Sequence, residues 1–264
     1  MNDDHWRVAT FNANSIRTRL PQILDWLERT DVDVLAVQET KVQNREFPLD
    51  EFRRAGFYAV FYGVKGHSGV AVISRREPQQ VRFGLDQEDE EEDKARALRC
   101  VIDEVPILNT YVPQGRDIQS PEFQRKLRWF ARLRALLERE YAPDEPLLWL
   151  GDLNVAPEPI DVYDPKRFKD HVDFHPAVRQ AFRDIMAWGL VDLFRRHHPN
   201  EPNHYTYYDY RAKNPVEENK GWRVDHILAT APLAERCINA WIDTQARLVE
   251  RPSDHTFLVA EFSF

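Results

Sequence analysis

Residues 147–154 combine a short apolar run with polar side chains that could take part in catalysis. Four bulky apolar residues at positions 147–150 precede Gly151, and Asp152 and Asn154 then follow at alternate positions. The apolar run predicts a short strand that is buried on both faces. Because alternate residues of an extended chain point to the same side, the carboxylate and the amide would converge where the strand ends. Such a pair could bind a metal ion or activate water, although a simple turn is the commoner explanation of an isolated Gly-Asp.

The same arrangement of a polar side chain beside a predicted buried strand recurs along the chain. The residues concerned are Asn12, Glu39, Tyr111, Asp152, Asn154, Asp225, Asp254 and His255. If these strand ends share one edge, their carboxylates crowd together and stay ionised only with a cation among them. Ligands that are mostly oxygen favour a hard metal ion, Mg²⁺ or Mn²⁺. A turn or a cap explains any single residue equally well, but the eight together favour one shared site.

Length and composition indicate one folded domain over residues 1–264. Of these residues, 42% are hydrophobic and 12% aromatic, which is enough to bury a sizeable core. Cys100 and Cys237 are too few for a disulfide framework or a cysteine-based zinc site. The first residues carry no basic-then-apolar leader, and no apolar run approaches membrane-spanning length. We therefore expect a soluble, cytoplasmic protein.

Most of the net charge of −8 comes from residues 86–93, which include seven acidic residues and no basic one. A block of like charges repels itself, so we expect this segment to be a solvated, mobile surface loop. The remainder of the chain is nearly neutral. A nucleic-acid partner would therefore have to meet a local concentration of Arg and Lys rather than a global positive field.

The elements that must position these residues alternate without a regular repeat. Apolar and alternating runs predict strands over residues 7–12, 33–39, 58–62, 69–74, 147–150, 205–210, 221–228 and 256–262, with two more within 99–111. Helical spacing predicts helices over 20–29, 48–56, 120–137 and 176–188. Pro21 suits the first turn of one helix, and Ser120-Pro121-Glu122 is a strong start for another. Since helices are few for the number of strands, we expect two sheets packed face to face with helices outside.

Seven short motifs occur in the order in which a known family carries them. They are Phe11-Asn12, Gln38-Glu39-Thr40-Lys41, Ser68-Gly69-Val70-Ala71, Asn109-Thr110-Tyr111-Val112-Pro113, Gly151-Asp152-Leu153-Asn154, Gly221-Trp222-Arg223-Val224-Asp225 and Ser253-Asp254-His255. Together they resemble the exonuclease III family of abasic-site endonucleases, within the endonuclease/exonuclease/phosphatase superfamily, over essentially the whole chain. The resemblance implies an α/β fold like that of deoxyribonuclease I: a four-layer sandwich of two packed mixed β-sheets flanked by helices.

The resemblance implies that the cluster holds Mg²⁺, with Mn²⁺ as the alternative. The residues expected at the metal are Asn12, Glu39, Asp152, Asn154, Asp254 and His255. Glu39 would be the principal ligand, helped by Asn12 and Asp254, and the ion would neutralise charge that develops on a phosphate.

The catalytic residues that the resemblance implies are Tyr111, Asp152, Asn154, Asp225 and His255. Asp152, positioned by Asn154, would orient and deprotonate the attacking water. His255 would donate to a non-bridging phosphate oxygen, with Asp225 fixing its orientation. Tyr111 would hydrogen-bond the phosphate. Such in-line attack depends mainly on positioning and electrostatics.

Substrate recognition is expected from residues near this cluster. By the resemblance, Tyr207, Tyr208 and Trp222 wall a pocket for a flipped-out, baseless sugar, although core packing is a fair alternative for each. The candidate phosphate contacts are Lys41, Gln114, Arg116, Arg167, Arg211 and Arg223. Arg223 could instead be the structural partner of a nearby carboxylate.

These observations indicate a Mg²⁺-dependent DNA repair nuclease. It would cut double-stranded DNA 5′ of abasic sites and process blocked 3′ ends as an exonuclease and a 3′-phosphatase or phosphodiesterase, acting as a monomer. One alternative is an enzyme restricted to 3′ ends. Gln114 stands where Asn is common in the family, and residues 167–175 place His171 and His175 near the expected pocket.

Two further alternatives concern other classes of function. A relative within the superfamily could act on a non-DNA phosphoester, such as a phosphoinositide, sphingomyelin or an RNA tail. The aromatic segment 205–210 with Gly221-Trp222-Arg223 favours DNA over these. A binding module that has lost catalysis would lack at least one of the ligands, and none is missing from the sequence.

Overall fold

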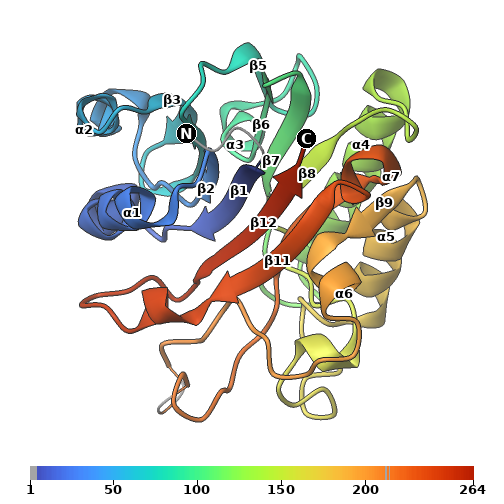
Figure 1. The fold of residues 1–264 in the computed structure, drawn as a ribbon. Coiled ribbons are helices and arrows are strands. Elements are labelled where there is room, and N and C mark those ends of the chain that lie inside the picture. Colours follow the sequence, from blue (N-terminus) through green and yellow to red (C-terminus); the bar gives the residue numbers. More distant parts are fainter. Residues whose placement is uncertain (1–4, 212, 214) are drawn as a thin grey trace.

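The computed structural model describes residues 5–211, 213 and 215–264, which form two six-stranded mixed β-sheets (Figure 1). The first sheet has the order β11-β12-β1-β2-β4-β3, built from β1 (His5–Asn12), β2 (Val34–Gln38), β3 (Tyr58–Val64), β4 (His67–Ser74), β11 (Cys237–Asp243) and β12 (Phe257–Ser263). The second has the order β5-β6-β7-β8-β10-β9, built from β5 (Gln79–Phe83), β6 (Ala97–Ile102), β7 (Val105–Tyr111), β8 (Leu148–Asp152), β9 (Leu190–Asp192) and β10 (Asp225–Thr230).

Helices cover the outer face of each sheet (Figure 1). On the first sheet these are α1 (Ile16–Thr30) and α2 (Leu49–Arg54), and on the second α4 (Pro121–Glu140) and α5 (Pro176–Met186). The shorter elements are α3 (Glu91–Lys94), α6 (Leu193–His197), α7 (Ala231–Ala234) and the 3₁₀ turns η1 (Asn44–Glu46), η2 (Pro159–Asp161) and η3 (Thr244–Arg247). Among the described residues, no helix has the length and apolar character needed to cross a membrane.

The side chains of β8 point alternately toward the other sheet and toward the outer helices. Leu148 and Leu150 pack between the two sheets, where they join Val8 of the first sheet. Trp149 points to the other side and packs with residues of α4, including Phe130. Because successive strand residues face opposite sides, one apolar run serves both interfaces. The predicted four-layer sandwich of two mixed sheets flanked by helices is confirmed.

The two predicted helix starts have different outcomes. The Ser120 side chain accepts the backbone N–H of Phe123, so this residue is the N-cap of α4, as predicted. The expectation for Pro21 is wrong, because α1 already begins at Ile16. The N–H groups of Ser15 and Ile16 donate to carbonyl oxygens of the segment that follows β2. A tertiary contact therefore takes the place of the local cap that the sequence pattern would require.

Several other elements differ from the sequence-based expectation. Residues 205–210 form no regular strand; Tyr207 makes only isolated bridges, to Trp222 and to His255. Among the strands not predicted, β5 and β11 lie at sheet edges and alternate poorly, since much of each is exposed. Edge strands need only one partner and bury less, so their periodicity is weak.

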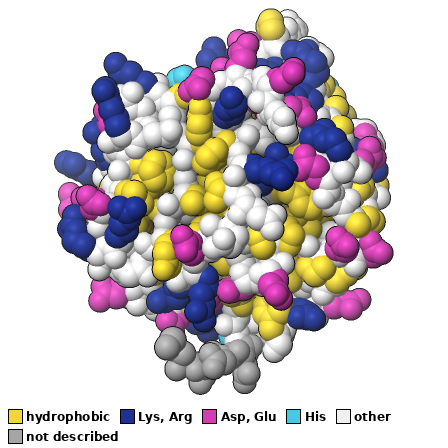
Figure 2. All heavy atoms as spheres, turned by 90° about the horizontal axis from the view of Figure 1, so that it is seen from above, with side chains coloured by type: hydrophobic (Ala, Val, Ile, Leu, Met, Phe, Trp, Pro, Cys, Tyr) yellow, Lys and Arg dark blue, Asp and Glu magenta, His cyan; other side chains and the backbone are white. Residues whose placement is uncertain are grey.

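The acidic segment 86–93 lies at the surface, but it is less solvated than its composition predicts. It contains the start of α3, and Asp89 is only 8% exposed. Arg132 of α4 pairs with both Asp89 and Asp93, and Arg125 lies 2.7 Å from Asp93. Ion pairing with one helix offsets the self-repulsion that the sequence alone suggests. On the face shown in Figure 2, charges of both signs are interspersed and neither forms a continuous field.

Candidate active site

A cleft of about 680 Å³ opens where strands of both sheets end. The predicted site residues that line it are Glu39, Tyr111, Gln114, Arg116, Asp152, Asn154, Arg167, Tyr207, Arg211, Trp222, Asp254 and His255. Asn12 and Asp225 lie immediately behind this lining and hydrogen-bond to it. The structure therefore gathers side chains from both ends of the chain at one edge of the sandwich.

Strand register explains part of this convergence. Tyr111 is opposite Asp152 in the parallel pair β7–β8, and Asp225 is opposite the same aspartate in the antiparallel pair β10–β8. Gly151, which precedes it, has φ of +144°, and a Cβ there would collide with the carbonyl oxygen of Thr110. Glycine thus allows β8 to approach β7 closely at the residue before the carboxylate.

Asn12 links the two sheets at the floor of the cleft. Its Nδ2 donates to Glu39 Oε1 at 2.8 Å and to Asp152 Oδ2 at 2.9 Å. Its Oδ1 accepts the backbone N–H of Asn14 at 2.9 Å. This hydrogen bond uses one lone pair of the amide oxygen and leaves the other, so the role of Asn12 at the metal stays a prediction. In this structure Asn12 holds two carboxylates in place through its nitrogen.

The second carboxylate oxygen of Glu39, Oε2, pairs with Lys41. Lys41 Nζ lies 2.8 Å from Glu39 Oε2 and 2.5 Å from Asn14 Oδ1, and Asn14 Nδ2 donates to Asp254 Oδ1 at 3.0 Å. Burial alone would raise the pKa of Glu39, but the charge of Lys41 and the hydrogen bond from Asn12 outweigh it and lower the pKa. Glu39 therefore stays ionised. Lys41, predicted to contact phosphate, pairs with Glu39 instead of lining the cleft.

His255 lies between two aspartates. Its Nδ1 is 2.7 Å from Asp225 Oδ2, and its Nε2 is 3.8 Å from Asp152 Oδ2. Burial alone would lower the pKa of His255, but the two carboxylates raise it to about 10. Burial raises the pKa of Asp152 to about 8. The charges of Asp225 and Glu39 also raise this pKa, whereas the charge of His255 lowers it. Without a metal ion, both the aspartate and the imidazole are therefore protonated at neutral pH, and the two groups titrate as a coupled pair.

The donor set fits a divalent cation. Ligand atoms of Asp152, Asp225 and His255 lie within 4.8 Å of one another, and Asp225 Oδ1 is buried without a hydrogen-bond partner among the described residues. Glu39 and Asp254 add further carboxylate oxygens to the same cleft. A hard ion is the usual solution for such a concentration of buried carboxylates.

Two other groups complete the polar side of the cleft. Burial and the charge of Glu39 raise the pKa of Tyr111 well above its ordinary value, so its phenol stays protonated and can donate. Asn154 donates its side-chain N–H to Val112 and its backbone N–H to Asp152 Oδ1. Asn154 and Glu39 both adopt left-handed backbone conformations, with φ of +48° and +50°. Such strain is common where a functional side chain has to be aimed.

Aromatic residues form the opposite wall. Tyr207 lies 4.9 Å from His255, measured between ring centroids. Trp222 contacts Phe168 and His171, with centroid distances of 4.9 and 4.6 Å. Phe168 was not singled out by the sequence analysis, although an isolated aromatic residue within a polar, irregular segment is a usable signal.

Besides Lys41, two predicted substrate contacts do not reach the cleft. Tyr208 is 3% exposed, and its hydroxyl donates to Asn219. Arg223 is fully buried and lies 2.7 Å from Asp161 and 2.8 Å from Asp192. The predicted phosphate contact is wrong, and the alternative, a structural carboxylate partner, is what the structure shows. A buried arginine paired on both sides cannot swing out without leaving two buried charges unpaired.

A buried lysine that the sequence analysis missed supports the rim. Lys126 of α4 is fully buried, and its Nζ donates to the carbonyl oxygens of Gln114, Asn154 and Val172 and to Asp173 Oδ1. One ammonium group thus ties together three segments of the cleft. Its position on the helix offers no signal, because lysine at helical spacing is ordinarily solvated.

Several cationic side chains stand at the cleft's edge. Arg116 has a side chain that is 80% exposed, and its backbone N–H donates to Gln114 Oε1 at 2.8 Å. Arg211 pairs with Asp209 at 2.8 Å, and Arg167 lies over the ring of Phe168. These groups form a local concentration of positive charge beside the carboxylates.

Fold and site together define a class of phosphoester hydrolases, and residues 9–255 match the endonuclease/exonuclease/phosphatase family. The chain belongs to this family. It is 33% identical over 266 residues to exodeoxyribonuclease III from Haemophilus influenzae, a match that covers 97% of this chain and 99% of that protein.

Solved structures give the same result. An AP endonuclease from Archaeoglobus fulgidus superimposes with a TM-score of 0.94 at 49% identity, covering 97% of this chain and 99% of that one. A 3′ phosphatase from Neisseria, solved with a product DNA hairpin, superimposes with a TM-score of 0.92 at 33% identity, covering 98% and 100%. The predicted resemblance to the exonuclease III family is confirmed, and the chain is a nuclease.

Proposed function

We propose that this protein is a Mg²⁺-dependent DNA repair nuclease that acts as a monomeric single domain on double-stranded DNA. It hydrolyses the phosphodiester 5′ of abasic sites and removes blocking groups from 3′ ends as a 3′–5′ exonuclease and 3′-phosphatase or phosphodiesterase. The relatives named as an exodeoxyribonuclease III, an AP endonuclease and a 3′ phosphatase support this range.

The observation that carries the proposal is the Asn12 bridge between Glu39 and Asp152, opposite the His255–Asp225 pair. This bridge places Glu39, which is suited to bind a metal ion, beside Asp152, which is suited to act as a base. The imidazole of His255 lies on the far side. A phosphate between them would meet negative groups that need a cation and positive groups that stabilise its own charge.

The metal would be held by Glu39 with help from Asn12 and Asp254, and Asp152, Asn154 and His255 are close by. When bound, Mg²⁺ supplies charge neutralisation to the phosphate. It also opposes the burial and carboxylate repulsion that raise the pKa of Asp152, so that this residue can ionise.

Ionised Asp152 then takes a proton from a water molecule. The backbone N–H of Asn154 donates to Asp152 Oδ1 and so directs the other oxygen toward the cleft and His255. The oxygen of the water bonds to phosphorus while the bond from phosphorus to the 3′ oxygen breaks. The departing oxygen takes up one proton and leaves as a hydroxyl, which balances the proton that Asp152 accepted from the water. Alignment of these groups supplies most of the catalytic effect.

His255 and Tyr111 stabilise the phosphate during this attack. Asp225 keeps the imidazole charged and oriented through Nδ1, which leaves Nε2–H to donate to a non-bridging oxygen. The protonated phenol of Tyr111 is a second donor. His255 is buried and Tyr111 is partly buried, so their hydrogen bonds to developing charge are stronger than in water.

Tyr207 and Trp222 are proposed to enclose the baseless sugar, with Phe168 and His171 behind it. An apolar wall accepts a sugar that lacks a base and excludes a paired nucleotide. Arg116, with Gln114 bound to its backbone, is the proposed phosphate contact at the rim.

A second candidate is an enzyme that processes 3′ ends without incising internal abasic sites. The observation that favours it is the contact of His171 with Trp222 at 4.6 Å, which fills part of the aromatic side of the cleft. A narrower pocket would still admit a chain end.

The experiment compares two matched duplexes, one with an internal abasic-site analogue and one with a nick that carries a 3′-phosphate. Each is incubated with Mg²⁺ and with a chelator, using the wild type and Asp152→Asn. We expect metal-dependent cleavage of both substrates, lost in the variant. Release of the 3′-phosphate alone would support the second candidate. Cleavage of neither would refute a DNA repair role and direct attention to other phosphoesters.

A further inference from the structure

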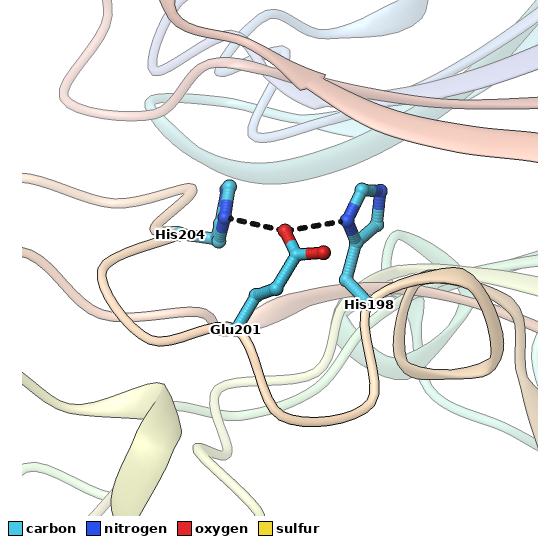
Figure 3. Close-up of side chains that lie close together, drawn as sticks. All are labelled: His198, Glu201 and His204. Carbon is cyan, nitrogen blue, oxygen red and sulfur yellow. Dashed lines mark hydrogen bonds and ion pairs between the residues drawn. The ribbon is translucent and has the colours of Figure 1, made fainter.

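Three side chains converge on one point outside the active site (Figure 3). They are His198, Glu201 and His204, in the segment that follows α6, and their ligand atoms lie within 4.8 Å of one another. Within the described part of the chain, two such groups occur, and the other belongs to the active site. No pattern in the sequence predicted this cluster, and the proposed DNA chemistry does not use it.

The distances suit a small coordination sphere. His198 Nδ1 lies 2.9 Å from Glu201 Oε2, and His204 Nε2 lies 3.2 Å from the same oxygen (Figure 3). Zinc binds nitrogen and oxygen at about 2.0–2.2 Å, so tetrahedral neighbours are separated by about 3.3 Å. Two of the three separations are already close to this value. The two histidine nitrogens lie within 4.8 Å of each other, so the rings would move closer together around a bound ion.

The hydrogen-bond geometry of His198 favours a cation at this point. Its Nε2 lies 2.8 Å from the carbonyl oxygen of Ala240, which can only accept, so Nε2 carries the hydrogen. In the neutral ring, Nδ1 then carries a lone pair, and this lone pair faces the carboxylate of Glu201. Two acceptors at 2.9 Å need a proton or a metal ion between them. Metal-binding histidines usually donate the N–H of their other ring nitrogen to an acceptor such as a backbone carbonyl oxygen, and His198 does so to Ala240.

The surrounding structure holds the ligands in position. Arg195 of α6 donates through NH1 to the carbonyl oxygens of His198 and Glu201, so both ligand residues have a fixed backbone. Phe194 stacks against the ring of His198 at 4.6 Å and 24°. Side-chain exposure is 24% for His198 and 38% for His204, so an ion from solvent can reach the cluster.

We propose that His198, Glu201 and His204 form a binding site for Zn²⁺, with water as the fourth ligand. Two imidazoles and one carboxylate favour this borderline ion over Mg²⁺, which prefers oxygen. The site would be structural. It would tie the segment 198–204 to β11 through Ala240, immediately before the residues that lead to Tyr207 of the cleft wall.

The test measures Zn²⁺ binding by the full chain in a background that removes three active-site carboxylates, Glu39→Gln with Asp152→Asn and Asp254→Asn, and so breaks up the other metal-competent cluster. Binding is followed by equilibrium dialysis with metal analysis, and the geometry by the visible absorption of Co²⁺ as a substitute. Thermal unfolding with and without Zn²⁺ gives a second readout that does not depend on catalysis. The test variants, each added to this background, are His204→Asn and Glu201→Gln, both at accessible positions.

His5→Asn is the matched control, because His5 lies 3.9 Å from Glu261 and has the same pair of residue types without a second imidazole. We expect one Zn²⁺ per chain in the background protein and in the control, with a tetrahedral Co²⁺ spectrum and a raised unfolding temperature. His204→Asn and Glu201→Gln should weaken binding at least about tenfold and abolish the temperature shift. Unchanged affinity in both variants, or no binding by the background protein, would overturn the proposal.

Discussion

His255 Nδ1 lies 2.7 Å from Asp225 Oδ2, behind the cleft, while His255 Nε2 faces Asp152 across it. Asp225 belongs to β10 of one sheet, and His255 precedes β12 of the other. The pair therefore joins the two layers at the point where the proposed chemistry occurs. Its geometry also fixes which nitrogen a substrate can reach.

Asp225→Asn should reduce kcat roughly 10²–10⁴-fold with little change in KM, because the imidazole loses both its charge partner and its orientation. The measurement is steady-state cleavage of the abasic duplex across a range of pH. Asp184→Asn, at an exposed position on α5, is the control and should leave kcat within about twofold. A loss of less than tenfold in Asp225→Asn would contradict the assigned role.

The stability of the metal-free protein should depend on pH through His255. Its pKa of about 10 lies above the ordinary value of 6.5, so the folded protein keeps a proton that the unfolded chain releases. This contribution is fully present below about pH 6.5, and the free energy of unfolding falls as pH rises toward 10. Urea unfolding with chelator present, at pH 6 and pH 9, measures it. His255→Gln should show a shallower decrease, and an equal decrease would assign the effect to other groups.

Asn12→Asp should lower kcat at saturating Mg²⁺ by about ten- to a hundredfold. The substitution keeps the size of the side chain but removes the N–H groups that hold Glu39 and Asp152. The added negative charge should also raise the pKa of Asp152 further and move the acid side of the pH–rate profile to higher pH. Asn239→Asp, an exposed residue of β11, is the control. An unshifted profile would show that Asn12 does not act on Asp152.

Lys126→Met should destabilise the protein by about 3–5 kcal/mol, because Asp173 and three carbonyl oxygens lose a buried charged donor. Thermal and urea unfolding measure the change. The exposed Lys169→Met is the comparison and should lie within about 0.5 kcal/mol of the wild type. A small effect of Lys126→Met would mean that the rim does not depend on this ammonium group.

Arg116→Ala should weaken DNA binding without changing stability, because its side chain is exposed at the rim. If Arg116 contacts one phosphate, the slope of log K against log salt should decrease by about one. Binding of a non-cleaved duplex at several salt concentrations measures this. Arg128→Ala, exposed on α4 and absent from the cleft lining, should leave the slope unchanged. Equal slopes for the two variants would remove Arg116 from the DNA interface.

Local patterns were sufficient for much of the fold and for the polar residues at the strand ends, whereas the aromatic wall of the cleft was predicted only through the family resemblance. The apolar run of β8 and the alternate placement of Asp152 and Asn154 follow from the twofold period of an extended chain. The N-cap at Ser120 likewise depends on a hydrogen bond within four residues. Such features act through neighbouring backbone dihedral angles, so they can be predicted from sequence order alone.

Only the tertiary structure decided where several charged groups find their partners. Arg223 pairs with Asp161, 62 residues away in sequence, and the acidic segment 86–93 pairs with arginines of α4. From the sequence alone, any of these charged side chains could face solvent, and the arginines could equally well bind phosphate. A charge removed from water requires a nearby opposite charge. Which charge is nearby depends on how distant segments pack, and no local pattern in the chain encodes that.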